Sequence, residues 1–298
     1  MSGLSQGWLA DVRFADYSDL FVPEGRQGVE VMQPTIQRND VLVPLIRELV
    51  QELGRQAQQQ GDERAARVVK DVQDQLSTMR TKSTAEVSPV LGAALGESPG
   101  QAQGIGEPLR ILAGALTTLL QIPGLRQAAQ WASGWLLLGH LSQVGRYLGR
   151  GEPDGAGRAL DVRVRERVLR GADPERPLVV VAHSLGTVVA FEALHHYSGP
   201  VRLLVTLGSP LATGAAVLQR VRPRPPCTPE RVARWLNFWD RDDIVVSRPR
   251  VQQWMGSSRS GVAPVTDRVD SDGIWVHTAT KYLQQPAVAG PVVEALKR

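Results

Sequence analysis

The sequence is poor in cysteine and in aromatic side chains, and each scarcity excludes a class of protein. Cys227 is the only cysteine among 298 residues, so an internal disulfide framework and a zinc site built from cysteines are both excluded. Seven Trp, four Tyr and four Phe leave few rings on which nucleic-acid bases could stack. Hydrophobic residues (42%) and charged residues (21%) lie near the globular average, which excludes a disordered chain and a collagen-like repeat.

Lysine is also scarce, so the basic side chains are almost all arginine. The 34 basic residues exceed the 30 acidic ones by a formal net charge of +4. Because the arginines are interspersed with acids, we expect no nucleic-acid partner. The arginines within 163–170 and 220–224 are interpreted as solvated faces, with an anionic headgroup or membrane surface as the alternative partner.

The chain shows no secretory signal and no good membrane span. Its first residues lack a basic region followed by an apolar one, so we expect a cytoplasmic protein. The two apolar stretches, 111–125 and 127–145, are interrupted by Pro123, Ser133 and His140. They are interpreted as a buried or cap helix pair, and a lid that touches a membrane is the alternative. Clusters of His, Cys, Asp and Glu with metal-ligand spacing are absent, and we expect no cofactor.

The first half of the chain is predicted to be mainly helical. Residues 11–15 alternate in polarity and predict a short strand. Asp40 is a candidate N-cap for a helix that begins at Val41, and a second helix is expected at about 62–80. We therefore expect a helical insertion or cap at about 40–148.

The second half has the regular alternation of an α/β domain. A helix is expected at 161–170, a strand buried on both faces at 178–182, a helix at 187–197 and a second buried strand at 201–207, followed by an apolar run at 235–239. This order predicts a doubly wound, mostly parallel sheet.

A nucleophile-elbow pattern lies between the first buried strand and its helix. Residues 182–186 read Ala-His-Ser-Leu-Gly, which is G-x-S-x-G with alanine in the first place. The tight strand-to-helix turn strains Ser184 and requires small neighbours, a condition that Ala182 and Gly186 meet. The N–H of Leu185, at the start of the helix, is the expected oxyanion donor.

A nucleophilic serine needs a base and an orienting acid, in the chain order Ser, Asp, His. Three aspartates follow the apolar run 235–239. Asp243 is the preferred acid because Asp-Ile-Val-Val resembles the D-x-V-(A/P/V) stretch that follows such a strand, Asp242 is the close alternative, and Asp240 is interpreted as a turn residue.

His277 is the only histidine after these acids, and it is therefore the predicted base. His183 is expected to point away from the site, and His195 and His196 lie near a helix C-terminus, where the helix dipole favours them. The remaining histidine, His140, also precedes the acids.

Four stretches carry a resemblance to bacterial α/β-hydrolase serine esterases and lipases: AHSLGTVVAFEALHHY, VTLGSPLAT, WLNFWDRDDIVV and HTATKYLQQPAV. The resemblance covers about 160–290 and implies a single α/β-hydrolase domain over 1–298, with a catalytic core at about 160–298. It implies hydrolysis of a carboxylic ester or acyl-lipid through an acyl-enzyme. Ser184 would be the nucleophile, His277 the base and then the acid, and Asp243 the residue that orients the imidazole.

The N-terminal part departs from that family's pattern. Relatives open with a strand that ends in His-Gly, whose loop supplies the second oxyanion N–H, and this chain contains no His-Gly. Either another loop substitutes, with Asp16-Tyr17-Ser18 as the nearest candidate, or the enzyme is weak. Two other hypotheses follow: a hydrolase-fold protein that binds or regulates a partner, and a lipid-surface protein that docks through the apolar block 111–148.

Overall fold

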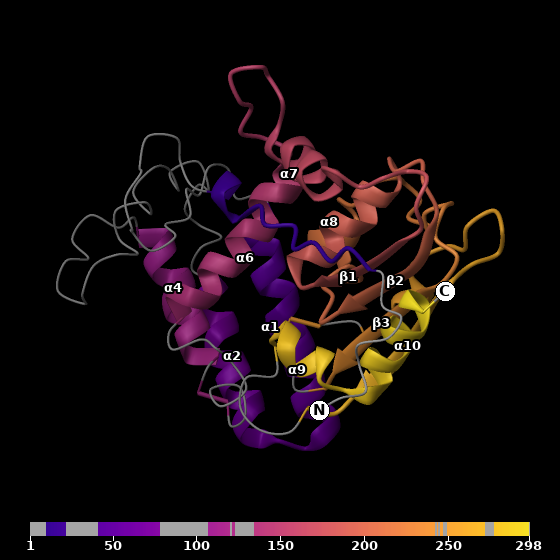
Figure 1. The fold of residues 1–298 in the computed structure, drawn as a ribbon. Coiled ribbons are helices and arrows are strands. Elements are labelled where there is room, and N and C mark those ends of the chain that lie inside the picture. The colour runs from indigo at the N-terminus through magenta and orange to yellow at the C-terminus, as the bar shows by residue number, and fades with distance from the viewer. Residues whose placement is uncertain are drawn as a thin grey trace, which may run out of the picture.

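The computed structural model describes residues 10–21, 41–77, 107–119, 121–122, 134–241, 243, 245–246, 249–271 and 277–297. These residues form an α/β structure with a four-stranded parallel sheet, and Figure 1 shows helices on both sides of that sheet. The strands are β1 (Leu178–His183), β2 (Val201–Leu207), β3 (Trp235–Asp240) and β4 (Pro264–Val269). They lie side by side in chain order, and each neighbouring pair is parallel.

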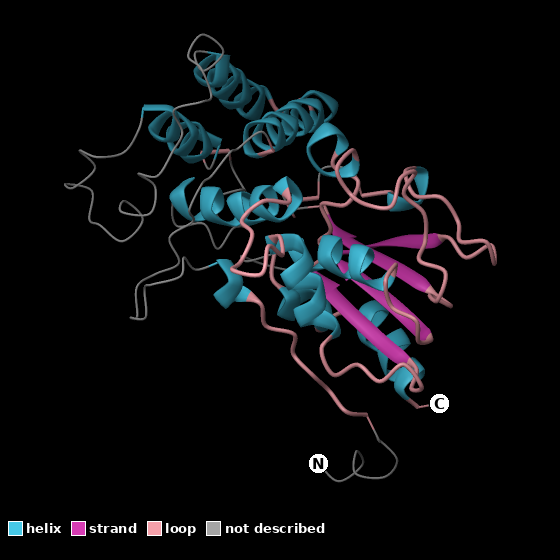
Figure 2. Ribbon diagram, turned by 90° about the horizontal axis from the view of Figure 1, so that it is seen from above, coloured by secondary structure: helices cyan, strands magenta, loops and turns pink. Residues whose placement is uncertain are grey.

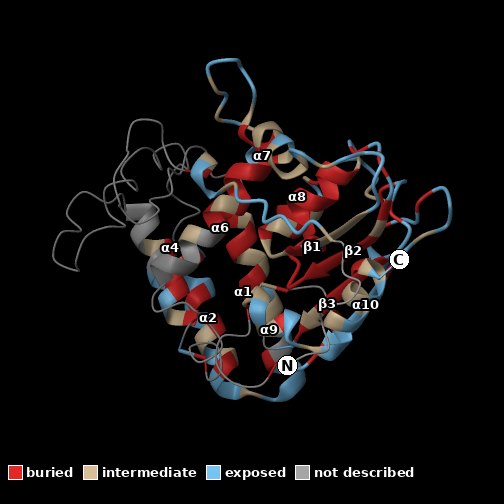
Figure 3. Cartoon of the chain, viewed as in Figure 1, coloured by how far each residue is buried: buried red, intermediate tan, exposed pale blue. Residues whose placement is uncertain are grey.

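Two apolar layers hold the sheet between helices. Alternate residues of a strand point to opposite faces, so β2 can contribute to both layers. Leu204 of β2 belongs to the larger core, which includes the buried side of α8 (Leu185–Leu194). Leu203 and Val205 belong to the second core, with Val288 of α10 (Pro286–Leu296). In Figure 3 the buried residues accordingly concentrate along α8 and the inner strands.

All the regular elements described between residues 41 and 149 are helices. They are α1 (Leu42–Gln60), α2 (Glu63–Ser77), α4 (Glu107–Leu119) and α6 (Gly134–Gly149). The four helices contact one another in the order α1, α2, α4, α6, and α1 also contacts η5 (Gly214–Leu218), which follows β2. Figure 2 shows this helical group beside the sheet rather than spread over one of its faces. The helical unit thus contacts the segment that follows the carboxyl end of β2.

The apolar block that suggested a lid is largely buried where it is described. Leu112, Leu116 and Leu119 of α4 are each at most 1% exposed, and Leu141 and Val144 of α6 are also buried. These side chains pack within the larger core, as expected of a buried helix pair. No described helix is both long and apolar enough to span a membrane.

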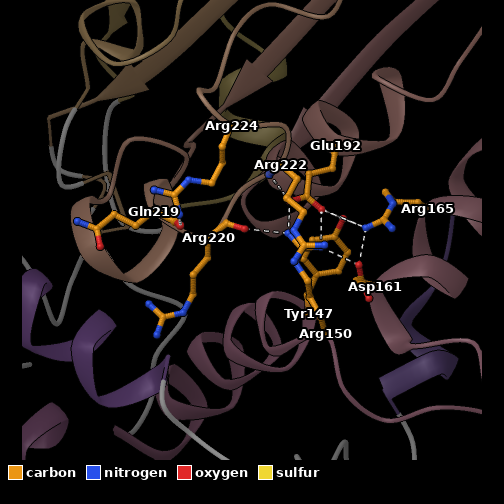
Figure 4. Close-up of polar contacts among 9 residues, drawn as sticks. All are labelled: Tyr147, Arg150, Asp161, Arg165, Glu192, Gln219, Arg220, Arg222 and Arg224. Atoms are coloured by element: carbon orange, nitrogen blue, oxygen red, sulfur yellow. Dashed lines mark hydrogen bonds and ion pairs between the residues drawn. The ribbon is translucent and has the colours of Figure 1, made fainter.

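A buried ionic network joins this helical unit to the helices that cover the sheet. Glu192 of α8 is 1% exposed and accepts hydrogen bonds from Arg150, Arg165, the Tyr147 hydroxyl and the backbone N–H of Arg222. Asp161, in α7 (Leu160–Leu169), pairs with the same two arginine side chains. Figure 4 shows these groups converging from α6, α7, α8 and the loop after η5. Because two cations face two anions, the network is internally neutralised and structural.

Three expectations about secondary structure need correction, and one strand was not predicted. Residues 11–15 form no strand: Val12 and Phe14 are 84% and 92% exposed, and Arg13 donates instead to the Gly171 carbonyl oxygen. The position before α1 is occupied by Val41 without a side-chain cap, and Asp40 lies outside the described residues. The prediction that the first strand is buried on both faces is wrong, because most residues of β1 are only half-buried and Val181 is 39% exposed. The pattern also missed β4 altogether.

Three short helical elements complete the described structure. They are η1 (Ser18–Phe21), η6 (Val251–Gln253) before β4, and α9 (Ala279–Leu283), which is capped by the Thr278 side chain. Figure 1 shows α9 at the arrowhead ends of the strands, which are their carboxyl ends. In parallel α/β sheets, functional side chains gather at this edge.

Candidate active site

Ser184 stands at a strained turn between β1 and α8. Its backbone has φ 53° and ψ −128°, a combination that a residue with a side chain rarely adopts. Such a conformation costs on the order of 1–3 kcal/mol, and it persists only where neighbouring contacts fix it. Here the Ser184 N–H donates to the Leu207 carbonyl oxygen at 3.1 Å, which extends the pairing of β1 with β2 by one residue.

A chain of hydroxyl groups holds the other side of this turn. Thr187 donates to the Ser184 carbonyl oxygen from both its N–H (2.9 Å) and its hydroxyl (2.7 Å). The Thr187 hydroxyl also lies 2.8 Å from the Ser209 hydroxyl, which follows β2. Thr187 and Ser209 are buried, whereas Ser184 is only half-buried. Hydrogen bonds from the buried Thr187 to the Ser184 carbonyl oxygen therefore fix the backbone of the turn, while the serine side chain stays accessible.

The structure brings Ser184, His277 and Asp243 together from distant parts of the chain. The His277 Nε2 lies 2.9 Å from the Ser184 Oγ, and the His277 Nδ1 lies 2.8 Å from the Asp243 Oδ2. His277 is 8% exposed and Asp243 is 3% exposed. Both distances are those of good hydrogen bonds, so the imidazole connects the hydroxyl to the carboxylate.

Asp243 is held as a buried carboxylate. Its Oδ1 accepts a hydrogen bond from the Val245 N–H at 3.0 Å, and its Oδ2 accepts a second one from the Tyr282 hydroxyl at 2.7 Å. Burial alone would raise the pKa of Asp243, but His277, Tyr282 and the Val245 N–H outweigh it and hold the pKa below its usual value. Asp243 is therefore ionised at neutral pH.

The predictions for the two neighbouring aspartates, Asp240 and Asp242, fare differently against the structure. Asp240 is the last residue of β3 and is 1% exposed, so its interpretation as a simple turn residue is wrong. Its Oδ2 accepts from the Ser271 N–H at 2.6 Å, which ties the end of β3 to the segment after β4. Asp242, the alternative acid, lies outside the described residues.

His183 does not point away from the site as expected. Its ring centroid lies 4.6 Å from that of His277, with the two rings tilted by 40°. It is also 6.1 Å from the ring of Tyr282. The His183 ring therefore packs against the His277 imidazole. His195, by contrast, lies 3.1 Å from the Cys227 carbonyl oxygen through its Nε2, and its pKa is lowered by burial.

Gly208 is a site residue that the sequence pattern did not identify. It follows β2 with a φ of +53°, where a side chain would be strained. A Cβ at this position would stand 2.6 Å from the Asp243 Oδ2 and 3.2 Å from the His277 Nδ1. The available signal was the glycine itself, placed directly after a buried strand at the edge where catalytic residues gather.

The start of α8 supplies donors beside the serine. Leu185 is the first residue of the helix, and an α-helix has no internal acceptor for its first N–H groups. The Tyr17 hydroxyl approaches from the N-terminal segment and lies 3.5 Å from where a Cβ of Gly186 would stand. Burial raises the pKa of Tyr17 to about 12, so the hydroxyl keeps its proton at neutral pH. Of the candidate segment Asp16-Tyr17-Ser18, the Tyr17 hydroxyl thus lies beside Gly186 of the elbow.

No group of His, Cys, Asp and Glu among the described residues is arranged to hold a metal ion. A scan against protein-family models, a search of curated proteins and a search of solved structures each found no match to this chain.

Proposed function

We propose that this protein is a serine hydrolase that cleaves a carboxylic ester through an acyl-enzyme on Ser184, and that its sheet and helices form an α/β-hydrolase fold. The observation that carries the proposal is the pair of hydrogen bonds from Ser184 to His277 and from His277 to Asp243, with the serine in a left-handed backbone conformation. This is the arrangement that activates a weak hydroxyl nucleophile.

In the acylation half-reaction, the Ser184 Oγ attacks the ester carbonyl carbon while its proton passes to the His277 Nε2. Asp243 remains ionised and stabilises the imidazolium, in keeping with its lowered pKa. The tetrahedral intermediate then expels the alcohol, which takes the proton from His277. Water repeats the sequence on the acyl-enzyme: His277 removes a proton from the water, the carboxylic acid leaves, and Ser184 recovers its hydrogen.

The oxyanion of each intermediate needs donors that are already in place. The Leu185 N–H lies one residue beyond the nucleophile and is the first donor in this proposal. The Tyr17 hydroxyl is the second, because it is a protonated phenol beside Gly186. A side-chain hydroxyl would then replace the loop N–H that the His-Gly unit supplies in the enzymes this chain resembles.

The direct experiment is labelling with a fluorophosphonate probe, in which an activated serine displaces fluoride from phosphorus. Wild-type protein is compared with Ser184→Ala and His277→Ala. Ser260→Ala and His196→Ala serve as matched controls, because both of those residues are exposed. We expect labelling that is lost in the first two variants and kept in the controls, followed by turnover in a panel of p-nitrophenyl esters.

Two results would contradict the proposal. One is a wild-type protein that melts cooperatively but neither labels nor hydrolyses any ester of the panel. The other is labelling that survives Ser184→Ala, because the reactive serine would then be a different one. The first result would favour the alternative hypothesis, a hydrolase-fold protein that binds a partner without turnover.

A further inference from the structure

One oxygen of Asp243 is shared by two donors that come from the same short segment of chain. His277 lies just before α9, and Tyr282 lies within it. The His277 Nδ1 is 2.8 Å from the Asp243 Oδ2, and the Tyr282 hydroxyl is 2.7 Å from that same atom. Any movement of α9 therefore changes both contacts of the carboxylate together.

The Tyr282 hydroxyl is itself fixed by a third group. It accepts a hydrogen bond from the Asp240 N–H at 3.1 Å, and the tyrosine side chain is fully buried. Because a phenol has one proton, this proton is committed to Asp243. The Asp240 N–H polarises the Tyr282 hydroxyl, and this strengthens the hydrogen bond that the hydroxyl donates to Asp243.

We propose that Tyr282 is a positioning residue that acts through Asp243 and sets how strongly the carboxylate holds the His277 imidazolium. This inference rests on the proposed function only for its kinetic consequence. A hydrogen bond to the Oδ2 withdraws charge from the atom that faces His277. Without the hydroxyl, the carboxylate attracts the imidazolium more strongly and loses one of the three donors that fix its orientation.

His183 and Asp240 are ionisable residues that the structure describes in contact with this pair. His183 of β1 lies against both the His277 and the Tyr282 rings. Asp240 of β3 presents its N–H to the tyrosine, while its own Oδ2 is engaged by the Ser271 N–H. Removing the hydroxyl leaves the His183 and Asp240 side chains in place but takes the acceptor from the Asp240 N–H, so its effect on His277 passes through Asp243.

A merely structural role for Tyr282 predicts a different outcome. Its ring belongs to the second core, as do Leu207, Phe238 and Val288, and phenylalanine would preserve that packing. If packing were the whole role, Tyr282→Phe would change the free energy of unfolding and nothing else. The pH behaviour of His277 therefore separates the two roles.

The test is Tyr282→Phe, with Tyr197→Phe as the matched control, because the Tyr197 hydroxyl donates to the Asp173 carbonyl oxygen in the same way but far from the triad. NMR with labelled histidine follows the pH at which the His277 ring takes up its second proton, and His277→Ala assigns the signal. We expect this pH to rise by about half a unit or more in Tyr282→Phe and to stay constant in Tyr197→Phe. The acid limb of kcat/KM moves the same way, and kcat falls about ten-fold.

The two readouts keep this inference separate from the proposed function. An unchanged His277 titration in a folded Tyr282→Phe protein overturns the role of Tyr282, even if the wild type labels with the fluorophosphonate. A shifted titration supports that role even if labelling fails and the hydrolase proposal falls with it.

A second variant covers the case in which Tyr282→Phe does not fold. Replacing the four tyrosines by 3-fluorotyrosine keeps every ring and hydroxyl but makes each phenol a stronger donor. We then expect the His277 titration to move to lower pH, and Tyr17→Phe, Tyr147→Phe and Tyr197→Phe backgrounds should keep that shift. A titration that does not move would overturn the inference.

Discussion

Gly208→Ala is expected to disable the proposed site although it adds only one methyl group. The methyl carbon would stand 2.6 Å from the Asp243 Oδ2 and 3.3 Å from the His277 Cε1. Ordinary contact begins at 3.4 Å, so the carboxylate has to retreat by most of an ångström. It cannot do so while it keeps the Val245 N–H and the Tyr282 hydroxyl as donors.

The magnitudes follow from two separate effects. A left-handed backbone costs a residue with a Cβ about 1–2 kcal/mol relative to glycine. Displacing the carboxylate weakens hydrogen bonds to a charged group, which are worth about 1.5–3 kcal/mol each. We expect the free energy of unfolding to fall by about 2.5–5 kcal/mol in total. The fluorophosphonate labelling rate should fall by about 100-fold, as expected for a misplacement of this size.

Gly61→Ala is the matched control for backbone strain. Gly61 has a φ of +67°, and a Cβ there would meet nothing within 4 Å. This variant should lose about 1–2 kcal/mol in urea unfolding and label at the wild-type rate. The reasoning is refuted if Gly208→Ala is folded and labels within about three-fold of the wild type, because the methyl group would then not reach the triad.

Three further predictions concern Tyr17 and the buried ionic network. Tyr17→Phe should lower kcat by about 10²–10³-fold at constant KM if the hydroxyl is an oxyanion donor, and an unchanged kcat in steady-state assays would exclude that role. Glu192→Gln should lower the free energy of unfolding by about 3–5 kcal/mol in urea titrations, because Arg150 and Arg165 lose a buried charged partner, while the labelling rate of the folded protein stays the same. Burial raises the pKa of Asp161, but ion pairs with Arg165 and Arg150 outweigh it and hold the pKa below 3.8, so its stabilisation is complete above that pH and is lost as the pH falls through the lowered value. Asp161→Asn should therefore flatten the acid side of the Tm-against-pH curve, and a slope equal to that of the wild type would contradict the assignment.

The residues proposed as nucleophile, acid and base were accessible from sequence because each choice depends on local or chain-order information. Ser184 stands in a five-residue pattern between a buried strand and a helix, so its turn was implied by its neighbours. His277 followed by elimination, since no other histidine comes after the acids. The choice of Asp243 is consistent with the contact of its Oδ2 with His277 at 2.8 Å.

Gly208, Tyr282 and His183 were beyond the reach of the pattern because their roles depend on what other segments bring to them. Gly208 matters only because the Asp243 and His277 side chains lie where a Cβ of residue 208 would stand. Tyr282 contacts a residue 39 positions away, and the sequence suggested only a helix around it. His183 was expected to point away from the site from its place within the elbow, and its ring contacts come from His277 and Tyr282, which lie far along the chain.

The fold was misread where the apolar run 178–182 was taken to indicate a strand that is buried on both faces of the sheet. β2 and β3 justify that inference: Leu204 and Trp235 are fully buried, and each strand is paired on both edges. β1 has an equally apolar sequence, yet it pairs only with β2 in the described part of the chain, and Val181 is 39% exposed. Hydrophobicity measures how favourable burial would be and carries no information about which strand lies alongside. The position of a strand within its sheet, and with it the surroundings of Ser184 directly after β1, therefore has to come from tertiary contacts.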